Sequence, residues 1–189
     1  WSTFILRKLF KNEEFEKKFI NRFCDALNTS FEKNNVEAKL DEHISMLIPE
    51  IDKHLKRWKL SRKKWEYELK VMKKFGNERL NYSRMHLMGK FNTGAIVNIQ
   101  VESQMGGYVV LNENVKIDNG TFEGKYFERI PVALRAVPNF GYRFLHWEGM
   151  SSENGDHELI VSLKKGRDTN LKAIFEKFEH PLANQIMIN

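Results

Sequence analysis

The spacing of hydrophobic positions changes once along the chain. From residue 3 to residue 91, apolar side chains recur every three or four positions, which is the period of an amphipathic helix. From Ala95 onward, apolar and polar residues alternate in short runs, which is typical of β-strands. The pattern therefore predicts an α+β chain, with an all-α N-terminal region followed by a small β-rich domain and a boundary near residue 93.

Capping residues predict where the helices begin and end. Asn12 precedes a run with acidic residues in its first turn, where the helix dipole favours negative charge. Asn35 and Ser61 precede the next two runs with helical apolar spacing and are expected to cap those helices. Gly76-Asn77 is expected to interrupt the helix that Ser61 starts, before a last helix from residue 78 to about residue 90.

The apolar stripes predict the core of the helical region. Pro49 lies inside the second stripe, so we expect a kink or a break near Ile48. Cys24 falls on the first stripe and is interpreted as a small core residue, and a lone cysteine excludes an internal disulfide. The positions expected to be buried are Phe15, Phe19, Ile20, Phe23 and Leu27, then Val36, Leu40, Ile44, Leu47, Ile48, Ile51, Leu55 and Trp58, then Trp65, Leu69, Met72 and Phe75.

The second half of the chain reads as short strands separated by turn residues. Gly106-Gly107, residues 118–120 and residues 154–156 have the Gly, Asn and Asp composition of tight turns. The loops at 112–114 and 150–157 are expected to be exposed. Strands are predicted at 96–102, 107–112, 126–137, 142–148, 158–163 and 171–176.

The charge divides the chain in the same way as the hydrophobic pattern. Residues 1–90 hold 21 Lys/Arg and 13 Asp/Glu, whereas the remainder holds 10 and 12, within a net charge of +6. No run of apolar residues is long enough to span a membrane. The first residue is Trp1 and not Met, so we expect the chain to begin inside a longer protein or to have been cut.

The helical region resembles the C-terminal part of the CotH family, the spore-coat-H-type atypical protein kinases. The resemblance rests on "LFKNEEFEKKFINRFCDALNTSF" and on "PEIDKHLKRW", which stand in the family's order and spacing. It covers roughly residues 1–90. The matching positions are Leu9, Asn12, Phe15, Phe19, Ile20, Arg22, Asp25, Leu27, Asn28, Thr29 and Phe31, then Pro49, Glu50, Ile51, His54, Arg57 and Trp58.

The β-rich domain is similar to the bacterial InlB-B-like repeat over residues 93–178. The resemblance implies a β-grasp-like fold in a surface protein, with residues 132–149 as its central hairpin. Leu134, Ala136, Phe144 and Trp147 are expected in its core, and Pro138 and Gly141 are expected to set the turn between two strands. The matching positions are Tyr126, Phe127, Val132, Leu134, Ala136, Pro138, Gly141, Tyr142, Phe144, Trp147, Gly149, Leu171, Ala173 and Phe175.

The chain lacks the motifs that grip a nucleoside triphosphate. It contains no Asp-x-Asp and no glycine-rich loop before a helix. The CotH resemblance implies that the catalytic groups, and any Mg-ATP bound by the parent protein, lie upstream of Trp1. We therefore expect no catalytic, cofactor-binding or metal-binding residue in this chain.

Two groups of polar residues are candidate sites. Glu50, His54 and Arg57 share one helical face and either contact nucleotide or substrate in the complete kinase or fix the helix by packing. The basic run from Lys53 to Lys74 is either a solvated helical face or a binding site for an anionic cell-surface polymer. Nucleic-acid binding is the least favoured alternative, because the tryptophans that could stack on bases are assigned to the core. Its candidate residues are Lys56, Lys59, Arg62, Lys63, Lys64, Lys70, Lys73 and Lys74.

These observations favour a non-catalytic part of a secreted or cell-surface CotH-like protein. Its helices are expected to buttress an upstream kinase-like domain, and its β-rich domain to make protein or surface contacts. One alternative is that the chain forms part of an active atypical kinase whose catalytic residues lie upstream of Trp1. The other is that it is a polyanion-binding helical module. We also expect self-association through aromatic surface, an extracellular or envelope location, and a separate tail at 179–189.

Overall fold

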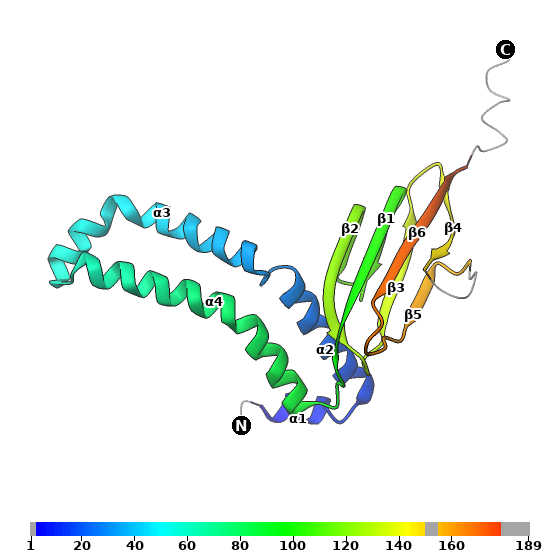
Figure 1. Ribbon diagram of the computed structural model, residues 1–189, viewed down its shortest axis with the longest axis horizontal. Helices are drawn as coiled ribbons and strands as arrows, with labels where there is room; N and C mark the ends of the chain where they lie inside the picture. The colour runs from blue at the N-terminus through cyan, green and yellow to red at the C-terminus, as the bar shows by residue number, and fades with distance from the viewer. Residues whose placement is uncertain (1–2, 150–154, 179–189) are drawn as a thin grey trace, which may run out of the picture. The chain divides into compact units, whose positions relative to one another are not determined.

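The computed structural model describes residues 3–149 and 155–178, with helices first and strands after them (Figure 1). This order confirms the predicted α+β class with a helical N-terminal region. The helices are α1 (Phe4–Leu9), α2 (Glu13–Asn28), α3 (Lys33–Trp58) and α4 (Arg62–Lys90). The strands are β1 (Ile96–Leu111), β2 (Val115–Phe127), β3 (Val132–Pro138), β4 (Tyr142–Glu148), β5 (Glu158–Val161) and β6 (Thr169–Lys177).

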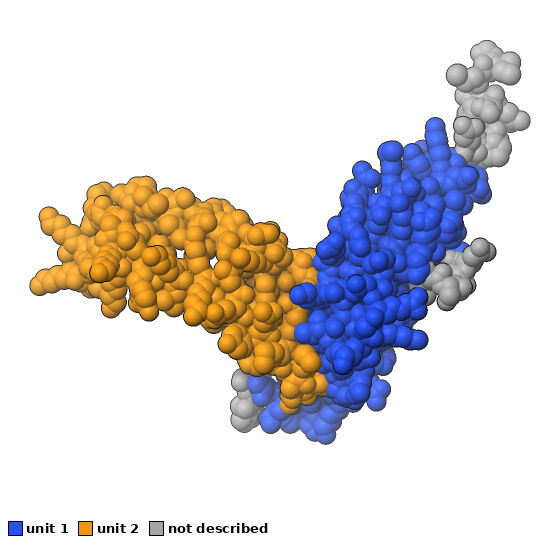
Figure 2. All heavy atoms as spheres, viewed as in Figure 1, with its two compact units in different colours: residues 1–25, 92–189 blue, residues 26–91 orange. Residues whose placement is uncertain are grey.

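The chain forms two compact units, which Figure 2 distinguishes by colour. One unit comprises residues 1–25 and 92–189, and the other comprises residues 26–91. The boundary predicted near residue 93 marks the change from helices to strands. The two units are instead defined by which residues pack together, and the first 25 residues pack with the sheet, so one border between the units lies inside α2. The predicted tail at 179–189 and Asn154 of a predicted turn lie outside the described residues.

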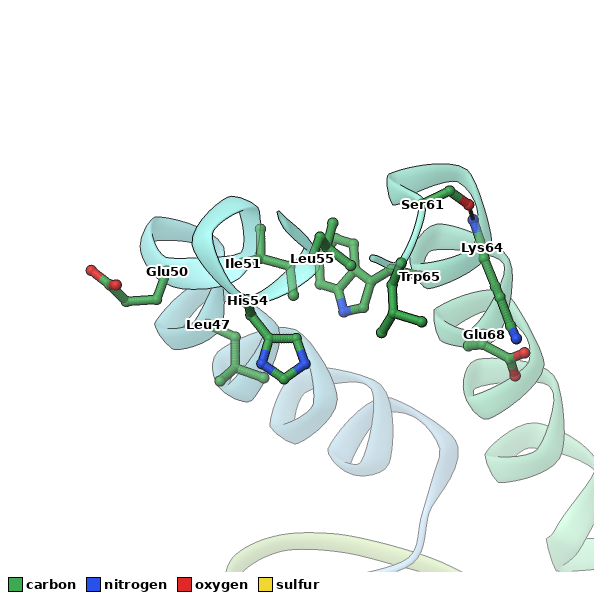
Figure 3. Close-up of a pocket in the computed structure, with 10 residues that line it drawn as sticks. Leu47, Glu50, Ile51, His54, Leu55, Ser61, Lys64, Trp65 and Glu68 are labelled. Carbon is green, nitrogen blue, oxygen red and sulfur yellow. Dashed lines mark hydrogen bonds between the residues drawn. The ribbon is translucent and has the colours of Figure 1, made fainter. Parts of the chain in front are cut away.

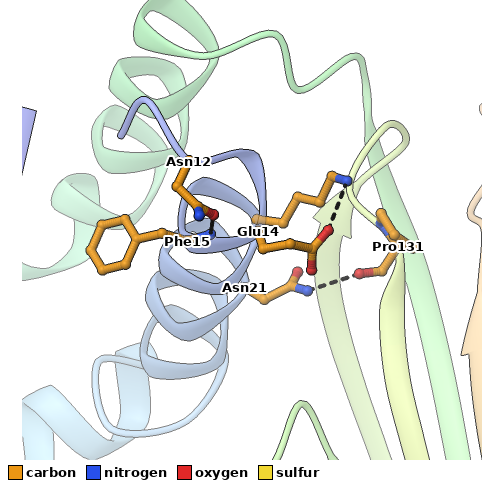
Figure 4. A network of polar contacts seen from close by, with 6 residues as sticks. Asn12, Glu14, Phe15, Asn21 and Pro131 are labelled. Atoms are coloured by element: carbon orange, nitrogen blue, oxygen red, sulfur yellow. Dashed lines mark hydrogen bonds and ion pairs between the residues drawn. The ribbon is translucent and has the colours of Figure 1, made fainter. Parts of the chain in front are cut away.

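Two of the three predicted helix caps are confirmed. The backbone N–H of Phe15 donates to Oδ1 of Asn12 at 2.9 Å (Figure 4), and α2 carries three glutamates in its first turn. The backbone N–H of Lys64 donates to Oγ of Ser61 at 3.1 Å. Each cap supplies an acceptor for an N–H that the first turn of a helix leaves unpaired.

The predicted cap at Asn35 is wrong, because α3 begins earlier. Glu32 is the capping residue, and its Oε2 accepts from the backbone N–H of Asn34 at 2.8 Å. Nδ2 of Asn35 instead donates to the carbonyl of Thr29 at 2.7 Å. The Glu32 carboxylate supplies an acceptor for the Asn34 N–H in the first turn, so the helix begins at Lys33, before Asn35.

Pro49 does not break α3. The helix runs unbroken from Lys33 to Trp58 with Pro49 inside it. Figure 1 shows a bend in the cyan part of this helix, which the colour bar places near residue 50. A proline removes one backbone hydrogen bond and displaces the preceding turn, and this helix absorbs that change by bending.

Gly76-Asn77 does not interrupt the helix either, since α4 is continuous from Arg62 to Lys90. A Cβ on Gly76 would lie 3.0 Å from Cγ1 of Val36 on α3, so the glycine allows close approach of the two helices. Nδ2 of Asn77 donates to Oε1 of Glu37 at 2.9 Å. The pair that resembles a helix stop is therefore a packing contact between α3 and α4.

The burial of the helices differs from the predicted stripes. On α2, Ile20, Cys24 and Leu27 are buried, which confirms Cys24 as a core residue. Phe23 is exposed, and Phe19 is only half-buried against Phe10 at 4.9 Å between ring centroids. The buried face is thus rotated away from the phenylalanines.

Between α3 and α4, the buried stripe is narrow. Ile51 and Leu55 are buried, but Trp58 is 61% exposed and Phe75 is 62% exposed, so their assignment to the core is wrong. Two helices packed only against each other cover one thin seam of each surface. Residues beside that seam remain in solvent although they share its period.

Within the described residues, six strands form one sheet in the order β4-β6-β1-β3-β5, with β2 also paired to β1. β1 is parallel to β6, and the other pairings are antiparallel. The predicted core positions Leu134, Ala136, Phe144 and Trp147 are all buried.

The predicted hairpin between β3 and β4 is wrong. β3 pairs with β1 and β5, whereas β4 pairs with β6, so the connection crosses between different neighbours. The turn itself follows Pro138 as expected. The N–H of Tyr142 donates to the carbonyl of Asn139 at 3.0 Å, and Gly141 has a φ of +80°.

Two predicted turns are irregular parts of strands instead. Gly106-Gly107 lies within β1, and residues 118–120 lie opposite it within β2, where the β1–β2 register shifts between Ser103 and Tyr108. A Cβ on Gly107 would lie 2.3 Å from the Phe175 ring, so the absent side chain makes room for that ring. Glycine here permits a bulge, not a chain reversal.

Candidate functional site

Asp25 of α2 lies at the centre of a buried polar cluster in the unit that contains the sheet. Its side chain is 2% exposed. It accepts hydrogen bonds from Nδ2 of Asn112 at 2.9 Å, from Nδ2 of Asn114 at 3.0 Å and from the hydroxyl of Tyr126 at 2.7 Å. These contacts fasten α2 to the β1–β2 turn and to β2.

The two amides are held in one orientation by further hydrogen bonds. Oδ1 of Asn112 accepts from the backbone N–H of Ala133 at 3.0 Å, and Oδ1 of Asn114 accepts from Arg22. Both NH₂ groups therefore point to Asp25, which has only acceptors to offer when ionised. Nearby, Nδ2 of Asn21 donates to the carbonyl of Pro131 at 2.8 Å, a second polar contact from α2 (Figure 4).

Asp25 is one of the positions on which the CotH resemblance rests, but its role in this cluster was not predicted. The loop at 112–114 was expected to be exposed, and Glu113 and Asn114 are, but Asn112 is half-buried. The asparagines at 112 and 114 were the available sequence signal of a tight turn between strands, and the structure gives Asn112 and Glu113 the positive φ of such a turn. Nothing in the sequence connected that turn to a residue 87 positions away.

The carboxyl group of Asp25 is expected to titrate above the ordinary aspartate value of 3.8. Burial raises its pKa, and the hydrogen bonds from Asn112, Tyr126 and Asn114, together with the charge of Arg22, only partly oppose that effect. The folded chain then binds this proton more tightly than the unfolded chain. This group's contribution to stability is fully present below 3.8 and is lost as the pH rises through the raised pKa. A carboxyl NMR titration with its midpoint at or below 3.8 would contradict this expectation.

An apolar cavity lies between α3 and α4 at the end where the two helices meet. Its volume is about 490 Å³. Figure 3 shows its lining side chains, which come from both helices and from their connection. The apolar lining is Leu47, Ile51, Leu55, Leu60 and Trp65, and the polar lining is Glu50, His54, Ser61, Lys64 and Glu68.

The predicted polar face of Glu50, His54 and Arg57 is divided by the structure. Glu50 and His54 line the cavity, and Glu50 forms an ion pair with Lys53 at 2.9 Å. The Arg57 guanidinium lies 5.7 Å from the centroid of the Trp58 ring. Within the described residues no hydrogen bond joins the three side chains, and their contact with nucleotide or substrate stays a prediction.

The candidate basic residues lie along the end of α3 and the first half of α4. Arg62 pairs with Asp52 at 2.5 Å, Lys73 with Asp41 at 2.6 Å and Lys74 with Glu78 at 3.7 Å. The rest of the group form no ion pair with any residue that the structure describes; they are Lys56, Lys59, Lys63, Lys64 and Lys70.

Comparison with known proteins supports the resemblance of the helical region. Residues 1–83 match the family model described as CotH kinase protein, which covers α1 to α3 and most of α4. No curated protein and no solved structure was found to match the chain. In the described parts of the chain, no helix combines the length and the apolar character needed to cross a membrane.

Proposed function

We propose that this chain is a non-catalytic docking part of a CotH-like kinase protein. In this proposal the α3–α4 hairpin receives an apolar segment of a kinase-like domain. The observation that carries it is the cavity of about 490 Å³ between α3 and α4, within the segment that matches the CotH kinase protein family. A site of this size with apolar walls and a few polar groups is typical of ligand and side-chain recognition.

Exposed apolar residues around the cavity support the same proposal. Leu47 is 56% exposed and Leu60 is 46% exposed although both line it. Apolar surface left in water favours association, by about 25 cal/mol for each Å² that a partner covers. The kinase-like domain is the favoured partner because the matching family model is named for a kinase and covers α3 and most of α4.

The β-rich unit is proposed as a second interaction module, similar to an InlB-B-like repeat. The buried positions Tyr126, Phe144 and Trp147 agree with the residues on which that resemblance rests. We propose a cell-surface or envelope location on the same resemblance. Two alternative functions remain, part of an active kinase and a polyanion-binding module. Phosphate transfer from Mg-ATP tests the first, and oligonucleotide binding tests the second.

Leu47→Asp/Leu60→Asp is expected to abolish binding of the chain to a separately produced CotH-type kinase domain. Two carboxylates in an apolar cavity cannot be covered without a large desolvation cost, so we expect at least a hundredfold loss of affinity. Isothermal titration calorimetry measures the affinity. Circular dichroism checks that the helices, which do not depend on these exposed side chains, are retained.

Met72→Asp/Met85→Asp provides the matched control, because it adds the same charge at two exposed residues of α4 that do not line the cavity. Equal loss of binding in both variants would contradict a docking role for the cavity.

The chain alone is expected to transfer no phosphate from Mg-ATP, and turnover above a no-protein blank would overturn the non-catalytic assignment. Sedimentation of the same variants shows whether the cavity also drives self-association.

A further inference from the structure

One face of α4 carries cations on both sides of an exposed tyrosine. Lys63, Tyr67, Lys70 and Lys74 stand four, three and four residues apart, so they lie on the same side of the helix. All four side chains are exposed, and Tyr67 is 63% exposed. At a rise of 1.5 Å per residue, this stripe is about 16 Å long.

This stripe lies opposite the surface by which α4 packs on α3. Trp65, Leu69 and Gly76 lie on the other side of the helix, and a Cβ on Gly76 would lie 3.0 Å from Val36 of α3. The stripe is therefore separate from the apolar cavity. Among the described residues, Lys63 and Lys70 have no ion pair, and the only acidic residues near the stripe in helical spacing are Glu66 and Glu78.

A second exposed aromatic residue lies just before α4. Trp58 is 61% exposed and carries the Arg57 guanidinium at 5.7 Å from its ring centroid. The sequence argument against nucleic acid assumed that Trp58 is buried, and the structure removes that assumption. Basic residues and exposed rings thus occur together at this end of the hairpin.

We propose that the Lys63–Lys74 face of α4 binds single-stranded nucleic acid. The lysines neutralise backbone phosphates, and the Tyr67 ring supplies a stacking surface for a base. A polyanion without aromatic rings uses the lysines only and gains nothing from Tyr67. The exposed ring between the cations therefore favours nucleic acid over other anionic polymers, and this inference does not depend on docking at the cavity.

The test uses the whole chain and a fluorescein-labelled 20-residue thymidine oligonucleotide in anisotropy titrations. Tyr67→Ala is expected to weaken binding about tenfold, because base stacking is lost, while Tyr67→Phe keeps the ring and the affinity. Lys63→Glu/Lys70→Glu is expected to weaken binding more strongly and to flatten the dependence of log Kd on log salt.

The matched control for charge is Lys33→Glu/Lys177→Glu, which changes the net charge equally but lies outside the stripe. Leu47→Ala/Leu60→Ala, which alters the cavity without adding charge, is expected to bind the oligonucleotide normally. The proposal is overturned if the wild-type chain does not bind at low salt or if the control lysines matter equally. It is also overturned if Tyr67→Ala binds like wild type, or if polyphosphate and heparin bind with the same dependence on Tyr67.

Discussion

Asp25→Asn is expected to lower the free energy of unfolding of the sheet-containing unit by about 2–3 kcal/mol at neutral pH. The substitution preserves size, but it replaces one acceptor oxygen by an NH₂ group. That group would face donors, because Asn112, Asn114 and Tyr126 all donate to Asp25. Neither asparagine can turn round without losing the bond that its own Oδ1 accepts from Ala133 or Arg22. The result is at least one buried donor without an acceptor.

Hydrogen exchange of β1 and β2 amides, or urea unfolding followed at the same strands, measures this effect. Tyr126→Phe removes a single donor and is expected to cost less, about 1–2 kcal/mol. Asp118→Asn is the matched control, because Asp118 is an exposed aspartate of the same unit. A change below about 0.5 kcal/mol for Asp25→Asn, equal to that of the control, would show that the donors do not converge on Asp25.

The helix caps at Asn12 and Ser61 could be predicted from sequence because each depends on residues within one turn. The exposure of Trp58 could not, because it depends on how many elements cover α3. Periodicity gives the direction in which a side chain points, and Trp58 continues the direction of Ile51 and Leu55. Since Trp58 is the last residue of its helix, it has a stripe position without the neighbour that would bury it.

The positions of β3, β4, β5 and β6 could be predicted from sequence, but β1 was predicted as two strands and most of β2 was missed. The partners of the strands could not be predicted. Strands next to each other in sequence usually pair, which favoured a hairpin of β3 and β4. The structure instead places β1 and β6 in contact with strands far away along the chain. Turn composition was similarly ambiguous, since the conformational freedom of Gly106-Gly107 serves a bulge beside Phe175.

The candidate sites show the same division between local and long-range information. The sequence marked Lys63 and Lys70 as candidate basic residues, and the structure adds that they share an exposed face of α4 with Tyr67. The apolar cavity depends on how α3 packs on α4, an arrangement that also brings Gly76 close to Val36. Residues of two helices had to be brought together before that site could be recognised.

Gly149→Ala is expected to destabilise the β-rich unit by more than about 3 kcal/mol. Gly149 follows β4 with a φ of +93°, a conformation that L-residues rarely adopt. A Cβ there would lie 1.9 Å from the carbonyl oxygen of Asn170 in β6. Because the obstacle is backbone inside a paired strand, no side-chain rotation relieves the clash, and β4 must separate from β6.

Gly141→Ala separates that clash from the cost of the backbone conformation. Gly141 also has a positive φ, +80°, but a Cβ there would meet no atom within 4 Å. Its substitution is therefore expected to cost about 1–2 kcal/mol, the price of a left-handed conformation alone. Hydrogen-exchange protection of the β6 amides that pair with Phe144 and Trp147 reports on both variants. Equal losses of protection in the two variants would mean that the backbone conformation, and not contact with Asn170, requires glycine at position 149. A larger loss for Gly149→Ala shows that the close approach of β4 and β6 requires it.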